Sequence, residues 1–112
     1  MKKTIFLLLL FASCMPSRKV SILSNSQSLP IGASVNIIGI GQKLPENAKL
    51  LGQIRIGDNG FSTNCKYDEV LAIAVNECRK MGANTFQIIQ HKDPTALGST
   101  CHRIKGDAYL VK

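Results

Sequence analysis

The spacing of hydrophobic residues is most regular between residues 67 and 81, where it predicts an amphipathic helix. Apolar side chains recur there every three or four residues, so they share one helix face. Acidic residues lie in the first turn and basic residues in the last, as the helix dipole favours, and Gly82 follows where a left-handed residue ends a helix. The apolar face consists of Leu71, Ala74, Val75, Cys78 and Met81.

Four segments rich in β-branched and other apolar residues predict strands on either side of this helix. In the second segment the polar Gln53 and Arg55 alternate with isoleucines, which indicates a strand with one buried face. The resulting order, β-β-α-β-β, predicts a small single α+β domain over residues 35–112, with the helix packed on an antiparallel-rich sheet. The expected strands are residues 35–40, 50–57, 85–90 and 103–111.

The start of the chain has the pattern of a secretory leader. A pair of lysines precedes an apolar run from Ile5 to Ala12, which is shorter than the roughly 20 apolar residues that span a bilayer. The run leads into FASC at residues 11–14, which resembles the lipobox where bacteria cleave a lipoprotein precursor before a cysteine that is acylated. We therefore expect residues 1–13 to be a signal peptide and Cys14 to be the lipid attachment site. The alternatives are an ordinary signal sequence without a role for Cys14, or a retained anchor.

Residues 14–34 are rich in serine, with proline near both ends, and predict a flexible tether between the lipid and the domain. Within this tether, Val20 to Leu23 has the composition of a short strand. Because two or more acyl chains anchor a protein stably, we expect the protein to stay on a bacterial envelope membrane. No acidic residue directly follows Cys14, which favours a position facing the periplasm over one at the cell surface.

The charge of the chain indicates little about its partner. The 112 residues include 14 basic and 7 acidic side chains, and the formal net charge is +7. The basic positions are scattered, which indicates a solvated surface more than a site for nucleic acid or anionic lipid. Aromatic residues are too few to suggest stacking on nucleic-acid bases. We therefore expect membrane contact through the lipid and no nucleic-acid partner.

Several short motifs resemble the domain of RcsF-type lipoproteins, which sense envelope stress at the outer membrane of Gram-negative bacteria for the Rcs phosphorelay. The resemblance implies the same α+β fold, a non-catalytic role in protein interaction or stress sensing, and a disulfide between Cys65 and Cys101. Export to an oxidising compartment favours that bridge, since Cys14 is expected to carry lipid and Cys78 lies on the apolar helix face. The motifs are LGQI (51–54), NC (64–65), GAN (82–84), CHR (101–103) and GDAYL (106–110).

Two features differ from that family. Its second disulfide would fall at His91 and Asp107, which are not cysteines here and which we expect to face each other across the last hairpin. The alternative is that they are two unrelated polar residues. The tether is also short and rich in serine, whereas that of the family is long, basic and rich in proline. The resemblance therefore implies the scaffold and an envelope protein partner more directly than the signalling mechanism.

The candidate chemistry is limited to cysteine and histidine. Cys101 and His102 are adjacent, so on a strand they point to opposite faces. The chain has no nucleophile elbow, recognisable carboxylate pair or phosphate loop, and we expect no catalytic residues and no cofactor. A metal- or redox-handling lipoprotein is the alternative function, with a zinc site built from Cys65, Cys101, His91 and His102. Those residues lack the close spacing of zinc motifs, and disulfide formation competes for the same thiolates.

Overall fold

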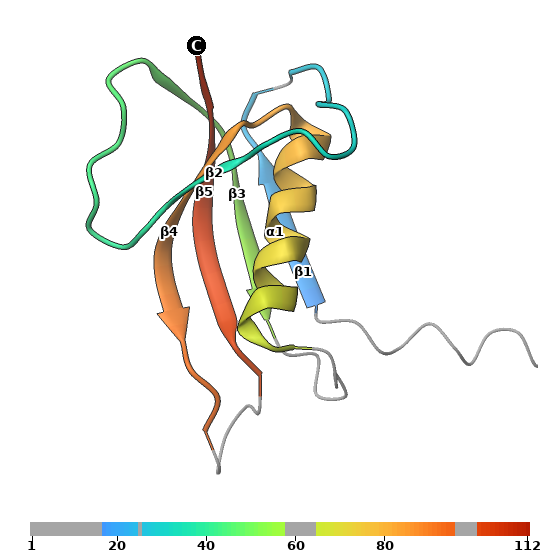
Figure 1. Cartoon of the computed structure of the whole chain (residues 1–112), viewed down its shortest axis with the longest axis vertical. Helices are drawn as coiled ribbons and strands as arrows, with labels where there is room; N and C mark the ends of the chain where they lie inside the picture. The colour runs from blue at the N-terminus through green and yellow to red at the C-terminus, as the bar shows by residue number, and fades with distance from the viewer. Residues whose placement is uncertain (1–16, 25, 58–64, 96–100) are drawn as a thin grey trace, which may run out of the picture.

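The computed structural model describes residues 17–24, 26–57, 65–95 and 101–112, and these form one helix and five strands (Figure 1). The α+β class predicted from the sequence is confirmed, as is the succession of strands, helix and strands. Within the described residues, no helix is long and apolar enough to cross a bilayer. The elements are β1 (Ser17–Ile22), β2 (Asn36–Ile38), β3 (Ala48–Gly57), α1 (Tyr67–Met81), β4 (Thr85–Lys92) and β5 (Arg103–Val111).

The strands form a single mixed sheet in the order β1-β3-β5-β4-β2, and α1 lies across one of its faces (Figure 1). β3 and β5 pair antiparallel at the centre, with β1 and β4 antiparallel on their outer sides. The short β2 runs parallel to β4 at the far edge. The sheet is therefore antiparallel-rich, as the sequence predicts, with one parallel pair.

β1 lies within the segment that the sequence predicts as a tether. It is longer than the short strand considered at residues 20–23, and it pairs with the whole second half of β3, from Ser17 opposite Gly57 to Ile22 opposite Gly52. The residues of β1 are mostly polar, so the strand depends on the open backbone edge of β3 more than on its own hydrophobic pattern. The sheet consequently begins well before the domain boundary expected at residue 35.

The core lies between α1 and the sheet. Cys78 is fully buried, as expected, but the inner helix face is turned slightly from the predicted one: Val70 and Glu77 are buried, while Leu71 and Val75 are only partly buried. Gly82 has a φ of 85° and ends the helix by donating its N–H to the carbonyl of Arg79, as predicted. The largest buried sheet residues are Phe86, Leu51, Ile54, Ile56 and Ile104.

Candidate functional site

The predicted disulfide between Cys65 and Cys101 is present, and the Cα atoms of the two residues lie 5.0 Å apart. The bridge joins the residue just before α1 to the residue just before β5 and is buried in the core. Because the two sulfurs are bonded to each other, they are not ligands for the zinc site considered from the sequence. The expected lipid site, Cys14, lies outside the described residues.

Cys78, the remaining described cysteine, is made unreactive by its surroundings. Burial raises the pKa of the Cys78 thiol to about 12, and the neighbouring negative charge of Glu77 acts in the same direction. The thiolate, which is the nucleophilic form, is therefore scarce at neutral pH. This confirms the prediction that Cys78 is a buried hydrophobic residue.

The expected pairing of His91 with Asp107 is wrong. The register of β4 and β5 places Asp107 opposite Gln87 and His91 opposite Ile104. Asp107 instead accepts a hydrogen bond from Gln53 Nε2 at 3.2 Å, on the neighbouring β3. An irregularity in β4 between Ile88 and Gln90 also reverses the alternation of side chains, so His91 and Asp107 lie on opposite faces of the sheet.

This irregularity brings His91 to the helix side of the sheet, where it meets His102. His91 Nε2 lies 3.0 Å from His102 Nδ1, close enough for one imidazole to donate a hydrogen bond to the other. Asp93 Oδ1 lies 3.5 Å from the first of these nitrogens and 3.7 Å from the second. Three potential metal-ligand atoms therefore converge at the end of the β4–β5 hairpin.

The first residue of α1 holds the two imidazoles in place. The ring of Tyr67 is centred 4.7 Å from that of His91 and 5.8 Å from that of His102. The His102 backbone N–H donates to the carbonyl of Cys65 at 3.2 Å, beside the disulfide. Arg103 Nη2 donates to the Asp93 carbonyl at 3.2 Å, which positions the third member of the cluster. Helix, disulfide and hairpin thus converge on one small polar cluster.

A second feature lies on the open face of the sheet, opposite the helix. Lys19 pairs with Arg55, Arg55 with Lys105, and Lys105 with Gln90, so these four residues form one row across β1, β3, β5 and β4. Cross-strand partners share a face, and Arg55 alternates with the buried Ile54 and Ile56, which point to the helix. The row therefore faces solvent.

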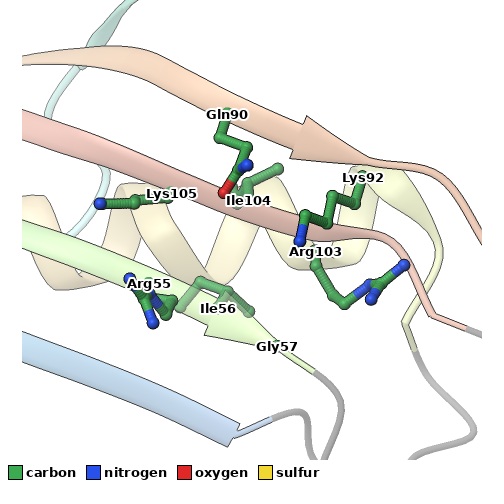
Figure 2. Close-up of a pocket in the computed structure, with 8 residues that line it drawn as sticks. All are labelled: Arg55, Ile56, Gly57, Gln90, Lys92, Arg103, Ile104 and Lys105. Carbon is green, nitrogen blue, oxygen red and sulfur yellow. The ribbon is translucent and has the colours of Figure 1, made fainter. Parts of the chain in front are cut away.

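Residues of β3, β4 and β5 line a groove of about 300 Å³ at this place. Figure 2 shows its basic side chains in front of the strands and α1 behind them. Lys92 and Arg103 lie beside the row, as the next cross-strand pair of β4 and β5 on the same face of the sheet. The Nε atom of Arg103 is buried and has no hydrogen-bond partner among the described residues. We call Lys19, Arg55, Lys92, Arg103 and Lys105 the basic face.

The like-charge pairs of the basic face oppose folding. Like charges directly opposite each other on neighbouring strands are destabilising, and Lys19–Arg55 and Arg55–Lys105 are both such pairs. Among the residues that the structure describes, Asp107 occupies the neighbouring row on this face, where it accepts a hydrogen bond from Gln53. Within the described residues, these like-charge pairs have no acid in their own row, and the resulting positive potential can attract an anionic group.

The sequence named His91 and His102 together as candidate ligands, but it did not indicate Asp93 as their neighbour. The basic face was not found from the sequence, where the basic positions look scattered. One signal was present: Arg55, Arg103 and Lys105 occupy the polar positions of alternating strands. The register that aligns them, and the irregularity that turns His91, depend on contacts between distant segments.

No family model, curated protein or solved structure matches this chain. Its structural class therefore comes from its own fold: an α+β domain with one helix on a five-stranded mixed sheet and one disulfide.

Proposed function

We propose that this protein is a non-catalytic, lipid-anchored envelope lipoprotein that works as an interaction module at its own membrane. In this proposal Cys14 carries the lipid, and the basic face contacts the phosphate groups of anionic lipids. The observation that carries the proposal is the register that gathers five basic side chains on the open face of the sheet.

The length of the chain before β1 supports the membrane as the partner. Cys14 precedes Ser17 by only three residues, which span at most about 10 Å when fully extended. Ser17 pairs with Gly57, and Gly57 lines the basic groove. A lipid on Cys14 therefore keeps this end of the sheet near the bilayer surface, where each Lys or Arg contributes about 1 kcal/mol of attraction to anionic headgroups.

The chemistry of the described cysteines supports a binding role over a thiol enzyme. Cys65 and Cys101 are bonded to each other, and burial raises the pKa of Cys78. The RcsF-like motifs add a role in envelope protein interaction, for which the membrane contact would set the orientation of the domain.

The experiment reconstitutes the purified lipoprotein in vesicles of phosphatidylcholine, with or without anionic phosphatidylglycerol. A nitroxide label on Gln90→Cys reports from the groove, and the same label on Glu69→Cys, which is exposed on α1, serves as the control position. We expect phosphatidylglycerol to shield position 90 from a water-soluble relaxation agent and to leave position 69 unchanged. High salt should reverse the shielding, because it screens these contacts.

Charge reversal identifies the residues responsible. Arg55→Glu together with Lys105→Glu should abolish the shielding, whereas the matched reversal Lys43→Glu with Lys66→Glu, at exposed positions outside the basic face, should preserve it. Equal accessibility of position 90 in both kinds of vesicle would overturn the membrane contact. Shielding seen only in native envelopes would identify an acidic protein as the occupant instead.

The anchor is tested separately by the intact mass of the protein extracted from membranes. We expect a chain that begins at Cys14 and carries two or more acyl groups. An unmodified Cys14, or a mature start elsewhere, would contradict the lipoprotein assignment.

A further inference from the structure

The donor atoms of His91, Asp93 and His102 have the separations of ligands around one metal ion. A zinc ion with ligands at about 2.0 to 2.2 Å in tetrahedral geometry holds neighbouring donor atoms about 3.3 to 3.6 Å apart. The observed separations are 3.0 Å between the two imidazole nitrogens and 3.5 and 3.7 Å from these nitrogens to the carboxylate oxygen. Shifts of a few tenths of an ångström would place all three donor atoms at bonding distance from one shared metal ion.

The scaffold orients the two imidazoles, while the Asp93 carboxylate is 81% exposed and is held through its backbone carbonyl. Tyr67 packs against both imidazoles, and His102 follows the disulfide-bonded Cys101. The irregularity in β4 places His91 on the same side as His102, a device that commonly re-aims side chains at functional sites. The imidazole side chains are 25% and 26% exposed, so an ion can reach them from solvent while most of each ring is held by the protein.

We propose that His91, Asp93 and His102 form a binding site for a divalent first-row transition-metal ion, for which Zn²⁺ is the probe. Two imidazoles and one carboxylate suit such an ion better than Ca²⁺ or Mg²⁺, which prefer oxygen ligands. The site differs from the ligand set considered from the sequence, because Asp93 takes the place of the two disulfide-bonded cysteines. Its imidazoles lie on the helix side of the sheet, whereas the basic face lies on the other side, and the two are linked by Arg103, which donates to the Asp93 carbonyl.

Metal binding changes which imidazole nitrogens carry hydrogen. In the absence of metal, one of the two facing nitrogens carries the hydrogen of the 3.0 Å contact. Coordination needs the lone pairs of both His91 Nε2 and His102 Nδ1, so the neutral ring that donates changes tautomer: its hydrogen moves from the facing nitrogen to the far nitrogen, and no proton is released overall. Because protons compete with the metal for these lone pairs, affinity should fall as the pH is lowered. With three protein ligands, a tetrahedral ion keeps one position for water or another ligand.

The test titrates Zn²⁺ into the oxidised full chain carrying Cys14→Ser, in which Cys78 is the remaining free thiol. We expect one ion per chain by calorimetry, chemical-shift changes at both imidazoles by NMR, and a higher midpoint of thermal unfolding. Co²⁺ substituted for Zn²⁺ should give the intense visible bands of tetrahedral coordination. His91→Gln, His102→Gln and Asp93→Asn should each weaken Zn²⁺ binding by at least about tenfold.

Two control variants test whether the loss of Zn²⁺ binding is specific to the three proposed ligands. Asp107→Asn removes an acid from the other face of the sheet, and Cys78→Ala removes the thiol, so both should bind Zn²⁺ like the parent chain. Retention of the disulfide and of the far-ultraviolet circular dichroism shows that each variant is folded. The proposal fails if the folded parent chain does not bind Zn²⁺, or if all three ligand variants bind it as tightly as the parent does.

Discussion

At the residue scale, Cys78 owes its chemical character to its place on the inner face of α1. Because burial raises its pKa to about 12 from an ordinary value of 9.0, the native protein at pH 8 should react with iodoacetamide at least about 100-fold more slowly than an exposed thiol. The rate should continue to rise with pH beyond pH 9, where an exposed thiol levels off. Cys78→Ala should lower the free energy of unfolding by about 1 to 2 kcal/mol through lost packing.

The raised pKa of Cys78 also determines how the stability of the fold changes with pH. A thiol whose pKa is higher in the folded than in the unfolded state stabilises the fold fully below the unfolded value and loses this contribution as the pH rises towards 12. Alkylation with and without urea, followed by peptide mapping, measures the reactivity of this residue. Rapid alkylation of Cys78 without denaturant would show that the helix face is not closed.

At the element scale, the attachment of β1 depends on a polar contact with the helix. Arg18 Nη1 donates to Glu77 Oε1 at 2.8 Å, and Glu77 also contacts Lys80 Nζ at 3.3 Å. The Glu77 side chain is only 9% exposed, so among the described residues Arg18→Met leaves this buried carboxylate with the more exposed Lys80 as its ion-pair partner. We expect a loss of about 1 to 2 kcal/mol of unfolding free energy, which urea denaturation measures.

The neighbouring residue supplies the control for this prediction. Lys19→Met removes the same charge from β1, but Lys19 is exposed on the opposite face, so the unfolding free energy should change by less than about 0.5 kcal/mol. Equal effects of the two substitutions would assign the loss to β1 itself and not to the ion pair with α1.

At the scale of the whole molecule, the disulfide joins parts of the chain that the helix separates. Cys65 and Cys101 are 36 residues apart. For a disulfide that closes a loop of this length, the chain-entropy model gives about 4 kcal/mol of stabilisation. A small domain has about 5 to 10 kcal/mol of net stability. Replacing both cysteines by alanine should therefore remove about 2 to 4 kcal/mol of the unfolding free energy.

Peptide mapping without reduction provides the covalent check. It should find one cross-link between residues 65 and 101 and a free thiol at residue 78. A link from Cys78 to either partner would contradict both the disulfide and the buried helix face. An unchanged urea midpoint in the double-alanine variant would show that the bridge adds nothing to global stability.

Local patterns were sufficient for most of the secondary structure. The bounds of α1 and of β5 agree with the sequence prediction, and β3 and β4 differ from it by two residues at one end. Helix periodicity and the left-handed stop at Gly82 depend on residues three or four positions apart, so a single sequence contains them. The disulfide was also predictable, because the helix face accounts for Cys78 and the motifs pair the two cysteines.

Only the tertiary structure determined which side chains lie next to one another and which face of the sheet each one occupies. β1 joins the sheet because β3 offers an open edge, and no local pattern in its polar sequence requires it. The register of four strands assembles the basic face, and one irregularity in β4 moves His91 away from Asp107 and onto His102. Pairing between strands joins residues far apart in the chain, and a shift of one position moves a side chain to the other face. For that physical reason the sequence by itself determined the elements, the disulfide and two histidines as candidate ligands. The contact of these histidines with Asp93, and the whole basic face, required the folded sheet.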